Sequence, residues 1–300
     1  MIREFVYLGW WWFRARILGI KKPMQSVIFI SDKCNLRCKH CSVYETKNPR
    51  TKTLQQIEEE LRWCYSEGSR FVDFEGGEVM LWRDGDKDIN DILDLTREIG
   101  FFSCTITTNA QLPFRGIRAD SVWVSMDGVG EYHDNIRGHG AFERLERNIR
   151  ESGVKHLSVN MVVNTENYES VPQALEYVKA SPYIETISFN FHTPFKGTEH
   201  LFLDRERRSQ VIDTIIRYKR QGYPVMNTVS GLEVMRRPPF KRYCWADNFI
   251  FSDGSRDPMC MGNKFDVCDK CGFCMGGEMN AMMRLCPDTI IAGLRLRLKS

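Results

Sequence analysis

From residue 23 to residue 222, short apolar runs rich in β-formers alternate with amphipathic runs of helical length. The expected strands are residues 26–31, 71–75, 102–107, 122–125, 157–163 and 186–191. The expected helices lie between and after them, at residues 53–66, 89–99, 141–151, 168–179 and 205–220. Strands that alternate with helices at this spacing form βαβ units, which build a parallel sheet. The pattern predicts an α/β fold, a partial (β/α)6 barrel of the TIM type, with functional residues at the carboxyl ends of its strands.

The pattern changes after Tyr223. Residues 244–286 hold six of the chain's 11 cysteines, together with several glycines and short apolar runs. We therefore expect three parts, which are an amphipathic aromatic segment at 1–22, the barrel at 23–222 and a small cysteine-rich domain at 223–300. A bound metal would stabilise the last part, because its apolar content alone is too small to fold it.

The cysteine count also indicates a compartment. Eleven cysteines cannot all pair, and no secretory signal precedes them. The apolar run at residues 5–13 is too short to span a bilayer. We expect a cytoplasmic protein, in which clustered cysteines bind metal rather than form disulfides. Cys64 and Cys104 stand alone within helix and strand patterns and are expected in the core.

The formal net charge is +3, and it is distributed unevenly. Both termini are basic, whereas the body of the chain is mildly acidic. A nucleic-acid-binding protein would instead carry a broad basic face. We therefore expect no nucleic-acid partner.

Three cysteines, Cys34, Cys38 and Cys41, follow the first expected strand on a short loop. Thiolates are the usual ligands of iron–sulfur clusters, and a [4Fe–4S] cluster normally takes four of them. Three thiolates would leave one iron open to a small molecule. The alternative is a zinc site, for which His40 is badly placed as a fourth ligand.

This Cys-x3-Cys-x2-Cys pattern after a first barrel strand resembles the signature of the radical S-adenosylmethionine (SAM) superfamily. The resemblance implies a [4Fe–4S] cluster whose open iron binds the methionine part of SAM. It also implies that an electron from the cluster cleaves SAM to a 5′-deoxyadenosyl radical, and that a reductant such as flavodoxin or ferredoxin supplies electrons. His40 stands where the family often has an aromatic residue, and is expected to contact the adenine.

Further polar elements follow in the family's order, near the ends of expected strands. Gly76-Gly77-Glu78 resembles the family's Gly-Gly-Glu-Pro element, which binds the methionine amino group, with Val79 in place of the proline. The alternative interpretation of Gly76-Gly77-Glu78 is a glycine turn with a solvated carboxylate. The resemblance implies further cofactor-binding residues, namely Asn109, Ser125, Asp127, Arg137 and Asn160. Arg137 is a fitting partner for the cofactor carboxylate. No residue is assigned a catalytic role.

Six cysteines near the C-terminus form a second set. Cys244 and Cys260, with Gly254 between them, resemble the opening of the SPASM/twitch extensions found on many radical SAM enzymes. The others are Cys268, Cys271, Cys274 and Cys286. Six cysteines supply one auxiliary [4Fe–4S] cluster with two to spare. The alternative is structural zinc, which four cysteines often hold at similar spacing.

The two termini suggest a membrane surface. Trp10-Trp11-Trp12 stands beside Arg14 and Arg16, and the last stretch, residues 290–300, is rich in leucine and basic residues. Tryptophan and arginine are favoured at the boundary of water and lipid. The alternative is that both termini pack on the barrel or at a dimer interface.

A second, looser resemblance concerns the substrate. Cys271 and Cys274 lead into Gly276-Gly277-Glu278, as in the family of radical enzymes that attach deoxyadenosine to hopenes. It implies a lipid or isoprenoid substrate, modified by hydrogen-atom abstraction or by adenosyl addition to an alkene, on the inner face of the membrane. The alternatives are a SPASM-type peptide maturase, a radical dehydrogenase of a small molecule, and a non-enzymatic iron–sulfur or zinc protein.

Overall fold

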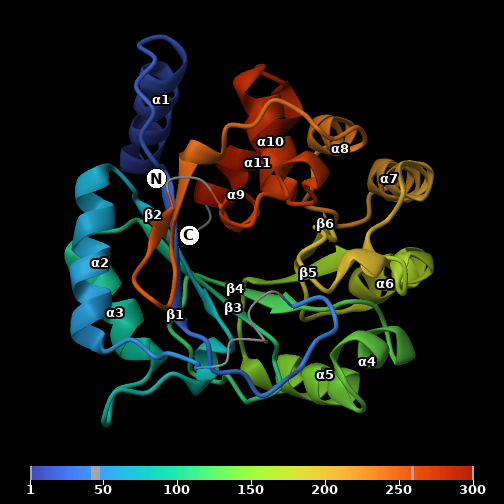
Figure 1. Cartoon of the computed structure of the whole chain (residues 1–300), viewed down its shortest axis with the longest axis horizontal. Helices are drawn as coiled ribbons and strands as arrows, with labels where there is room; N and C mark the ends of the chain where they lie inside the picture. The colour runs from blue at the N-terminus through green and yellow to red at the C-terminus, as the bar shows by residue number, and fades with distance from the viewer. Residues whose placement is uncertain (1, 42–47, 258–259, 299–300) are drawn as a thin grey trace.

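The computed structural model of this protein describes residues 2–41, 48–257 and 260–298, with side chains described up to residue 294. Within these ranges one eight-stranded sheet has the order β6-β5-β4-β3-β2-β1-β7-β8 (Figure 1). The strands are β1 (Gln25–Ser31), β2 (Phe71–Gly76), β3 (Ser103–Thr108), β4 (Ser121–Ser125), β5 (Leu157–Val163), β6 (Thr186–Phe191), β7 (Asp247–Ile250) and β8 (Arg256–Asp257). All six predicted strands form and pair in parallel. The sheet is not closed, which confirms the predicted partial barrel.

The five predicted helices also form, as α2 (Leu54–Glu67), α3 (Ile89–Ile99), α5 (Ala141–Ser152), α6 (Val171–Ala180) and α7 (Arg205–Arg220). Further helices are α1 (Ile2–Arg16), α4 (Glu131–Arg137), α8 (Val229–Met235), α9 (Met261–Lys264), α10 (Cys274–Met283) and α11 (Pro287–Leu298). Short 3-10 turns are η1 (Val79–Leu81), η2 (Tyr168–Ser170), η3 (Glu199–Leu201), η4 (Cys244–Ala246) and η5 (Cys268–Lys270). The helix predicted at 168–179 therefore begins as the 3-10 turn η2.

The two faces of the sheet differ in chemistry, because successive side chains of a strand point to opposite faces. Phe74, Ile106 and Val124 are fully buried on one face, in a core shared with apolar residues of α2, α3 and α5. We call the opposite face the inner face. Its register positions include Phe29, Asp73, Glu75, Thr107, Trp123, Ser125, Ser158, Asn160, Ser188 and Asn190. The barrel therefore presents a largely polar inner surface.

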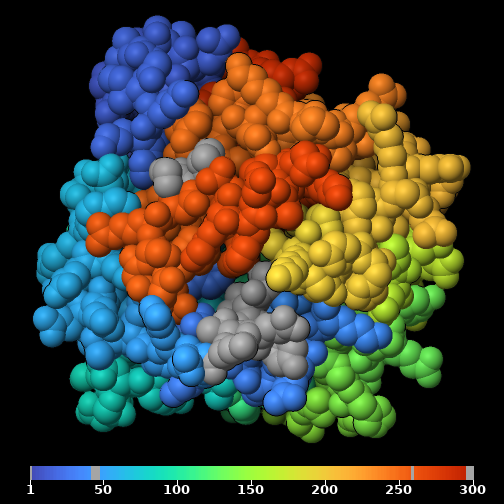
Figure 2. Space-filling model, in the orientation of Figure 1, coloured from blue at the N-terminus to red at the C-terminus, as the bar shows by residue number. Residues whose placement is uncertain are grey.

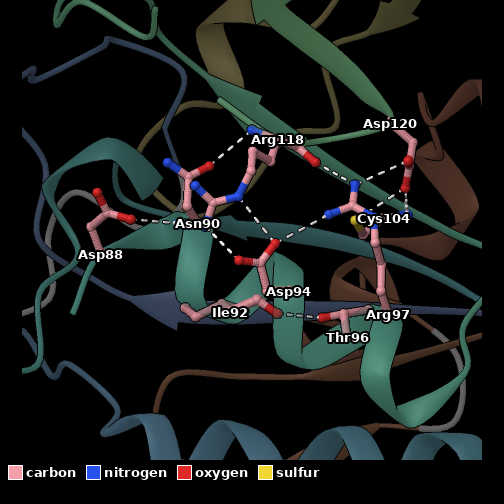
Figure 3. A network of polar contacts seen from close by, with 9 residues as sticks. All are labelled: Asp88, Asn90, Ile92, Asp94, Thr96, Arg97, Cys104, Arg118 and Asp120. Carbon is pink, nitrogen blue, oxygen red and sulfur yellow. Dashed lines mark hydrogen bonds and ion pairs between the residues drawn. The ribbon is translucent and has the colours of Figure 1, made fainter. Parts of the chain in front are cut away.

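An ion-pair network fastens α3 to the strands beside it (Figure 3). Arg97 Nη2 lies 3.0 Å from Asp120 Oδ1, and Arg118 Nε donates to Asp94 Oδ1 at 3.1 Å. The backbone N–H of Cys104 donates to Asp120 Oδ2 at 2.8 Å. Cys104, like Cys64, is fully buried, so both cysteines lie in the core as predicted.

The C-terminal segment contacts both edges of the six-stranded barrel sheet. On one side β7 pairs in parallel with β1. On the other side the N–H of Phe191, at the end of β6, donates to the carbonyl of Gly272 at 2.8 Å. A Cβ on Gly272 would collide with the Phe191 carbonyl, so glycine permits this close approach. The segment thus reaches from one open edge to the other, and the domain boundary at residue 222 stays a prediction.

Helix α1 packs on the body of the protein through one side. Trp11 is 6% exposed, and its indole N–H donates to the carbonyl of Lys22 at 2.8 Å. Its ring lies 5.7 Å from that of Trp245. The hydroxyl of Tyr7 donates to the carbonyl of Gly68 at 2.8 Å. None of the helices in the described ranges has both the length and the apolar character needed to cross a membrane.

Candidate functional site

The loop after β1 carries the three predicted cluster cysteines. Cys34 is exposed, Cys38 is buried and Cys41 is intermediate. Burial raises the pKa of Cys38 to about 11, and the charges of Cys41 and Cys34 add to the rise. The three thiols therefore lie close enough to influence one another. Because Cys38 is protonated at neutral pH in the free chain, iron must displace its proton on binding.

The end of β2 lies directly against this loop. The N–H of Gly77 donates to the carbonyl of Ser31 at 2.7 Å, and the N–H of Glu78 donates to the carbonyl of Lys33 at 2.8 Å. A Cβ on Gly76 would collide with the Ser31 carbonyl, and one on Gly77 with the Lys33 carbonyl. Only glycine fits at these two positions, which explains the Gly-Gly pair physically.

Glu78 ties the end of β2 to the end of β3. It is 1% exposed, its Oε1 accepts from Thr108 Oγ1 at 2.6 Å, and its Oε2 accepts from the Asn109 N–H at 2.7 Å. Burial raises the pKa of Glu78, although the hydrogen bonds from Thr108 and Asn109 oppose the rise. Both carboxylate oxygens thus have partners within the protein. A contact of Glu78 with the methionine ammonium of SAM stays a prediction.

Asn109 continues this chain of contacts to the cysteine loop. Its Nδ2 donates to Asn35 Oδ1 at 2.8 Å and lies 3.7 Å from the sulfur of Cys34. An amide N–H directed at a cysteine sulfur stabilises its thiolate form. The structure therefore brings Glu78, Asn109 and Cys34 together, as their order along the strands predicts.

A buried ion pair lies on the other side of the loop. Asp127, fully buried after β4, accepts from Arg137 Nε at 2.7 Å. Arg137 Nη1 also donates to the sulfur of Cys38 at 3.7 Å. Burial acts to raise the pKa of Asp127, but the charge of Arg137 holds it below its ordinary value. Asp127 and Arg137 are therefore both charged next to Cys38.

Two neutral imidazoles flank this ion pair. His40 Nε2 lies 3.6 Å from Asp127 Oδ2, and His133 Nδ1 accepts from the Asp127 N–H at 3.2 Å. Burial lowers the pKa of His40, and it lowers that of His133 to about 3. Among the described residues, nothing hydrogen-bonds to His40 Nδ1 or His133 Nε2, although both atoms are buried. Such orphaned polar atoms beside a cysteine loop fit a site that a polar cofactor completes.

Ser125 and Asn160 lie further along the inner face, where they are register partners on β4 and β5. Asn190 Nδ2 donates to Asn160 Oδ1 at 2.9 Å, and the N–H of Cys274 donates to Asn190 Oδ1 at 2.6 Å. Asn160 is thus linked to the C-terminal cysteine segment. Whether Ser125 and Asn160 contact SAM stays a prediction.

Some residues near the site were not predicted as ligands from the sequence. His192, which is 2% exposed, places its ring 6.4 Å from that of His40. Asn35 and Asn190 each join two predicted site residues. The alternation of β6 could have placed Asn190 on the inner face, but no local pattern indicates its partners.

Four of the C-terminal cysteines, Cys244, Cys260, Cys268 and Cys271, form a close group. Burial raises the pKa of Cys274, and the charge of Cys271 adds to the rise. A hydrogen bond between Cys244 and Cys260 raises the pKa of the first and lowers that of the second. Burial raises the pKa of Cys268 and Cys271, and the charge of Cys260 adds to both. Cys274 begins α10 and Cys286 follows it. A helix of this length, 10 residues, separates its ends by about 15 Å.

No three His, Cys, Asp or Glu side chains in the described ranges converge as they would around a single metal ion. The three cysteines after β1 are instead surrounded by polar atoms from the ends of β2, β3 and β4. A family model for the radical SAM superfamily matches residues 28–178, which is half of the chain. The chain belongs to the radical SAM superfamily.

Members of this superfamily are enzymes that bind a [4Fe–4S] cluster and SAM. The donor set around Cys34, Cys38 and Cys41 fits these groups, and the cysteine-rich C-terminal segment is consistent with an auxiliary cluster. When bound, the cluster and SAM supply radical chemistry through reductive cleavage of the sulfonium bond. The chain's own residues would hold the cluster by the three thiolates. They also keep Arg137 charged and His40 neutral beside it.

Three proteins of known sequence or structure are similar to this chain. The probable GTP 3′,8-cyclase of Methanocella arvoryzae is 27% identical over 184 residues, which cover 56% of this chain and 58% of that protein. Streptococcus suis SuiB, solved with S-adenosylmethionine, is 19% identical with a TM-score of 0.63, over 81% of this chain and 61% of SuiB. The structure of anSMEcpe with AdoMet and a Cp18Cys peptide is 19% identical with a TM-score of 0.61. The match covers 93% of this chain and 84% of that protein. The chain thus matches about three fifths of the first two proteins, and the structural likeness shows the fold.

Proposed function

We propose that this radical SAM enzyme modifies a lipid or isoprenoid substrate at a membrane surface, by hydrogen-atom abstraction or by adenosyl addition to an alkene. The observation that carries the proposal is the free side of α1. It is apolar, exposed and accompanied by basic residues. The proposal places the protein in the cytoplasm, on the inner face of the membrane. A reductant such as flavodoxin or ferredoxin would supply the electrons.

The free side of α1 exposes large apolar side chains at helical spacing. Ile2 is 82% exposed, Val6 is 62% exposed and Trp10 is 54% exposed. The other large apolar residues exposed on or just after α1 are Phe5, Phe13, Ile17, Leu18 and Ile20. Such a surface is unusual for a part of a protein that faces only water. Figure 2 shows α1 standing out from one corner of the molecule, so this surface is accessible.

Basic residues around α1 complement an anionic membrane. Arg14 and Arg16 lie in its last turn and Lys21 follows it, whereas Lys22 is paired with Glu67 at 2.8 Å. An apolar helix face with basic neighbours binds the interface of anionic lipids through apolar burial and charge attraction. Helix α11, which ends the described chain, also contacts α1. These features support the membrane surface as the occupant of this face.

Vesicle binding tests the surface. The triple variant Phe5→Ser, Val6→Ser, Trp10→Ser keeps the buried Trp11, and we expect its affinity for vesicles with anionic lipid to fall at least about tenfold. This is because burial of each side chain contributes roughly 1 kcal/mol or more. The matched control, Tyr183→Ser with Phe265→Ser, removes exposed apolar residues elsewhere, and should bind as wild type. Sedimentation with vesicles measures the affinity of the triple variant and that of the control. Equal binding by the triple variant and wild type would refute the membrane surface.

A peptide is the second candidate substrate. The fold is shared with SuiB, which was solved with the precursor peptide SuiA, and with anSMEcpe, which was solved with peptides. Anaerobic turnover with a fractionated cell extract separates the two candidates. If the substrate is a lipid, the lipid fraction should yield a modified product and increase the amount of 5′-deoxyadenosine. The peptide fraction should do neither.

The auxiliary cluster belongs to the same proposal. Its ligands would be the close group, Cys244, Cys260, Cys268 and Cys271. Reconstituted Cys260→Ala should hold less iron than wild type, by up to about four irons per chain, because the auxiliary [4Fe–4S] cluster loses one of its four thiolates. The matched control Cys286→Ala should keep its iron. An equal loss of iron in both variants would contradict this ligand set.

A further inference from the structure

Glu75 lies on the inner face beside the candidate cofactor site. It faces Phe29 of β1 in the sheet register and is two residues before Gly77, whose backbone contacts the cysteine loop. Its neighbours along the strand, Phe74 and Val72, belong to the core on the opposite face. The Glu75 carboxylate therefore projects from the carboxyl end of a barrel strand, where substrates of such barrels bind.

The described residues provide Glu75 with no hydrogen bond or ion pair. By contrast, Asp73, one step lower on the inner face, accepts from Gln25 Nε2 at 2.7 Å. Burial raises the pKa of Glu75 to about 7, and the charge of Asp73 adds to the rise. Glu75 is partly exposed, so its carboxylate is open to a ligand, and a bound cation would supply the counter-charge that the described residues do not. Glu75 has no part in holding the cysteine loop, so its position calls for another explanation.

Aromatic rings lie on both sides of Glu75 on the same face. Phe29 is its register partner on β1, and it is 5% exposed. Trp123 of β4 is the register partner of Thr107. The Phe74–Ile106 pair places Thr107 next to Glu75 on β3. Adjacent strands are about 4.8 Å apart, so Trp123 stands about 10 Å from Glu75, with Thr107 on the strand between them. A cation is attracted to the face of an aromatic ring, and one face of Phe29 already stacks on Phe251, with ring centroids 5.5 Å apart.

We propose that the inner face binds the ammonium group of the substrate. Glu75 would supply the opposite charge, Asp73 would reinforce it from below, and Phe29 and Trp123 would flank the cation. This inference rests on the proposed function and narrows it to an amphipathic substrate that carries an amine headgroup. Such a headgroup would lie beside the cofactor site.

Binding of octylamine, below its micelle-forming concentration, to the reconstituted enzyme tests the subsite. The variant Glu75→Gln keeps the shape and removes the charge. At pH 8 we expect it to bind octylamine at least about tenfold more weakly than wild type, as expected for loss of a desolvated charge partner. Octanol, which has the same chain without the charge, should bind wild type and variant equally. The matched control Glu98→Gln removes an exposed carboxylate of α3 and should change neither affinity.

The pH dependence gives a second readout. Ionised Glu75 attracts the ammonium group, so wild-type affinity for octylamine should fall about tenfold from pH 8 to pH 6, across the pKa of Glu75 at about 7. Asp73 is the charged neighbour that contributes to this pKa. Phe29, Thr107 and Trp123, from the neighbouring strands, carry no charge. Glu75→Gln should lose this dependence.

Two results would overturn the subsite: octylamine binding equally well to Glu75→Gln and wild type, or a parallel loss of octanol binding that points to a structural role. Vesicle binding tests the membrane surface and not the ammonium subsite. An enzyme that binds octylamine through Glu75 but ignores vesicles would keep the subsite and refute the membrane surface. The reverse pattern would refute the subsite alone.

Discussion

Replacement of Cys38 by alanine should reduce 5′-deoxyadenosine formation from SAM to the detection limit. Cys38 is 8% exposed, and its sulfur accepts from Arg137 Nη1, so its thiol is held in a defined position on the loop. With only Cys34 and Cys41 left, the N-terminal cluster would lack a ligand. Iron should fall by about four per chain relative to reconstituted wild type, because the whole cluster is lost. Anaerobic iron analysis and product chromatography measure the two effects.

Cys64→Ala is the matched control for this experiment. Cys64 is fully buried in α2 and has no predicted ligand role. Its replacement should keep the iron content and the 5′-deoxyadenosine yield. Full cleavage of SAM by Cys38→Ala, or equal losses in both variants, would rule out the assignment of Cys38 as a cluster ligand.

The sequence was sufficient for the barrel because its elements are marked locally. Thr53 begins α2 with a capping box, and Gly68 ends it with positive φ. Gly100 ends α3 in the left-handed region. These signals, together with the apolar period of each segment, determine where the helices and strands begin and end. Helix α4 was not expected, because seven residues that bury His133 and Arg137 show no apolar period.

The parts that depend on distant pairing could not be predicted. β7 has four residues, and it joins the sheet by pairing with β1, which lies more than 200 residues earlier. No local pattern can indicate such a partner. The contact between Gly272 and Phe191 is of the same kind, since only the folded chain shows that a side chain would collide there.

In the candidate site, too, locally marked features could be predicted and contacts between distant residues could not. Cys34, Cys38 and Cys41 are recognisable because their spacing lies within one loop. The ends of β2, β3 and β4 could be placed together, since carboxyl ends of parallel strands share one edge of a sheet. The sequence could not show which groups each carboxylate of the site contacts. Binding of the cofactor's ammonium by Glu78 stays a prediction, and no local pattern indicates that its oxygens also accept from Thr108 and the Asn109 N–H.

The second large effect is expected at the ion pair of Asp127 and Arg137. Arg137→Met keeps most of the side-chain volume but leaves Asp127 buried without its partner. Breaking a buried pair by removing one member costs about 3–5 kcal/mol of unfolding free energy. The exposed pair of Arg118 and Asp94 gives the matched control, because its side chains are 52% and 47% exposed. Arg118→Met should cost less than about 1 kcal/mol. Urea denaturation of the metal-free chain at pH 8 measures both.

The pH response distinguishes this electrostatic cause from a packing defect. In wild type the pKa of Asp127 lies below its unfolded value of about 3.9, so the pair stabilises the fold above that pH and the benefit disappears as pH falls. In Arg137→Met, burial would act with less opposition and raise the pKa of Asp127 above its unfolded value. The penalty would then be full at pH 8 and shrink as the pH is lowered and Asp127 takes up a proton. Asp127→Asn added to Arg137→Met should recover much of the loss at pH 8, since no buried charge remains. A double variant no more stable than Arg137→Met would show that lost packing, and not an unpaired carboxylate, destabilises the chain.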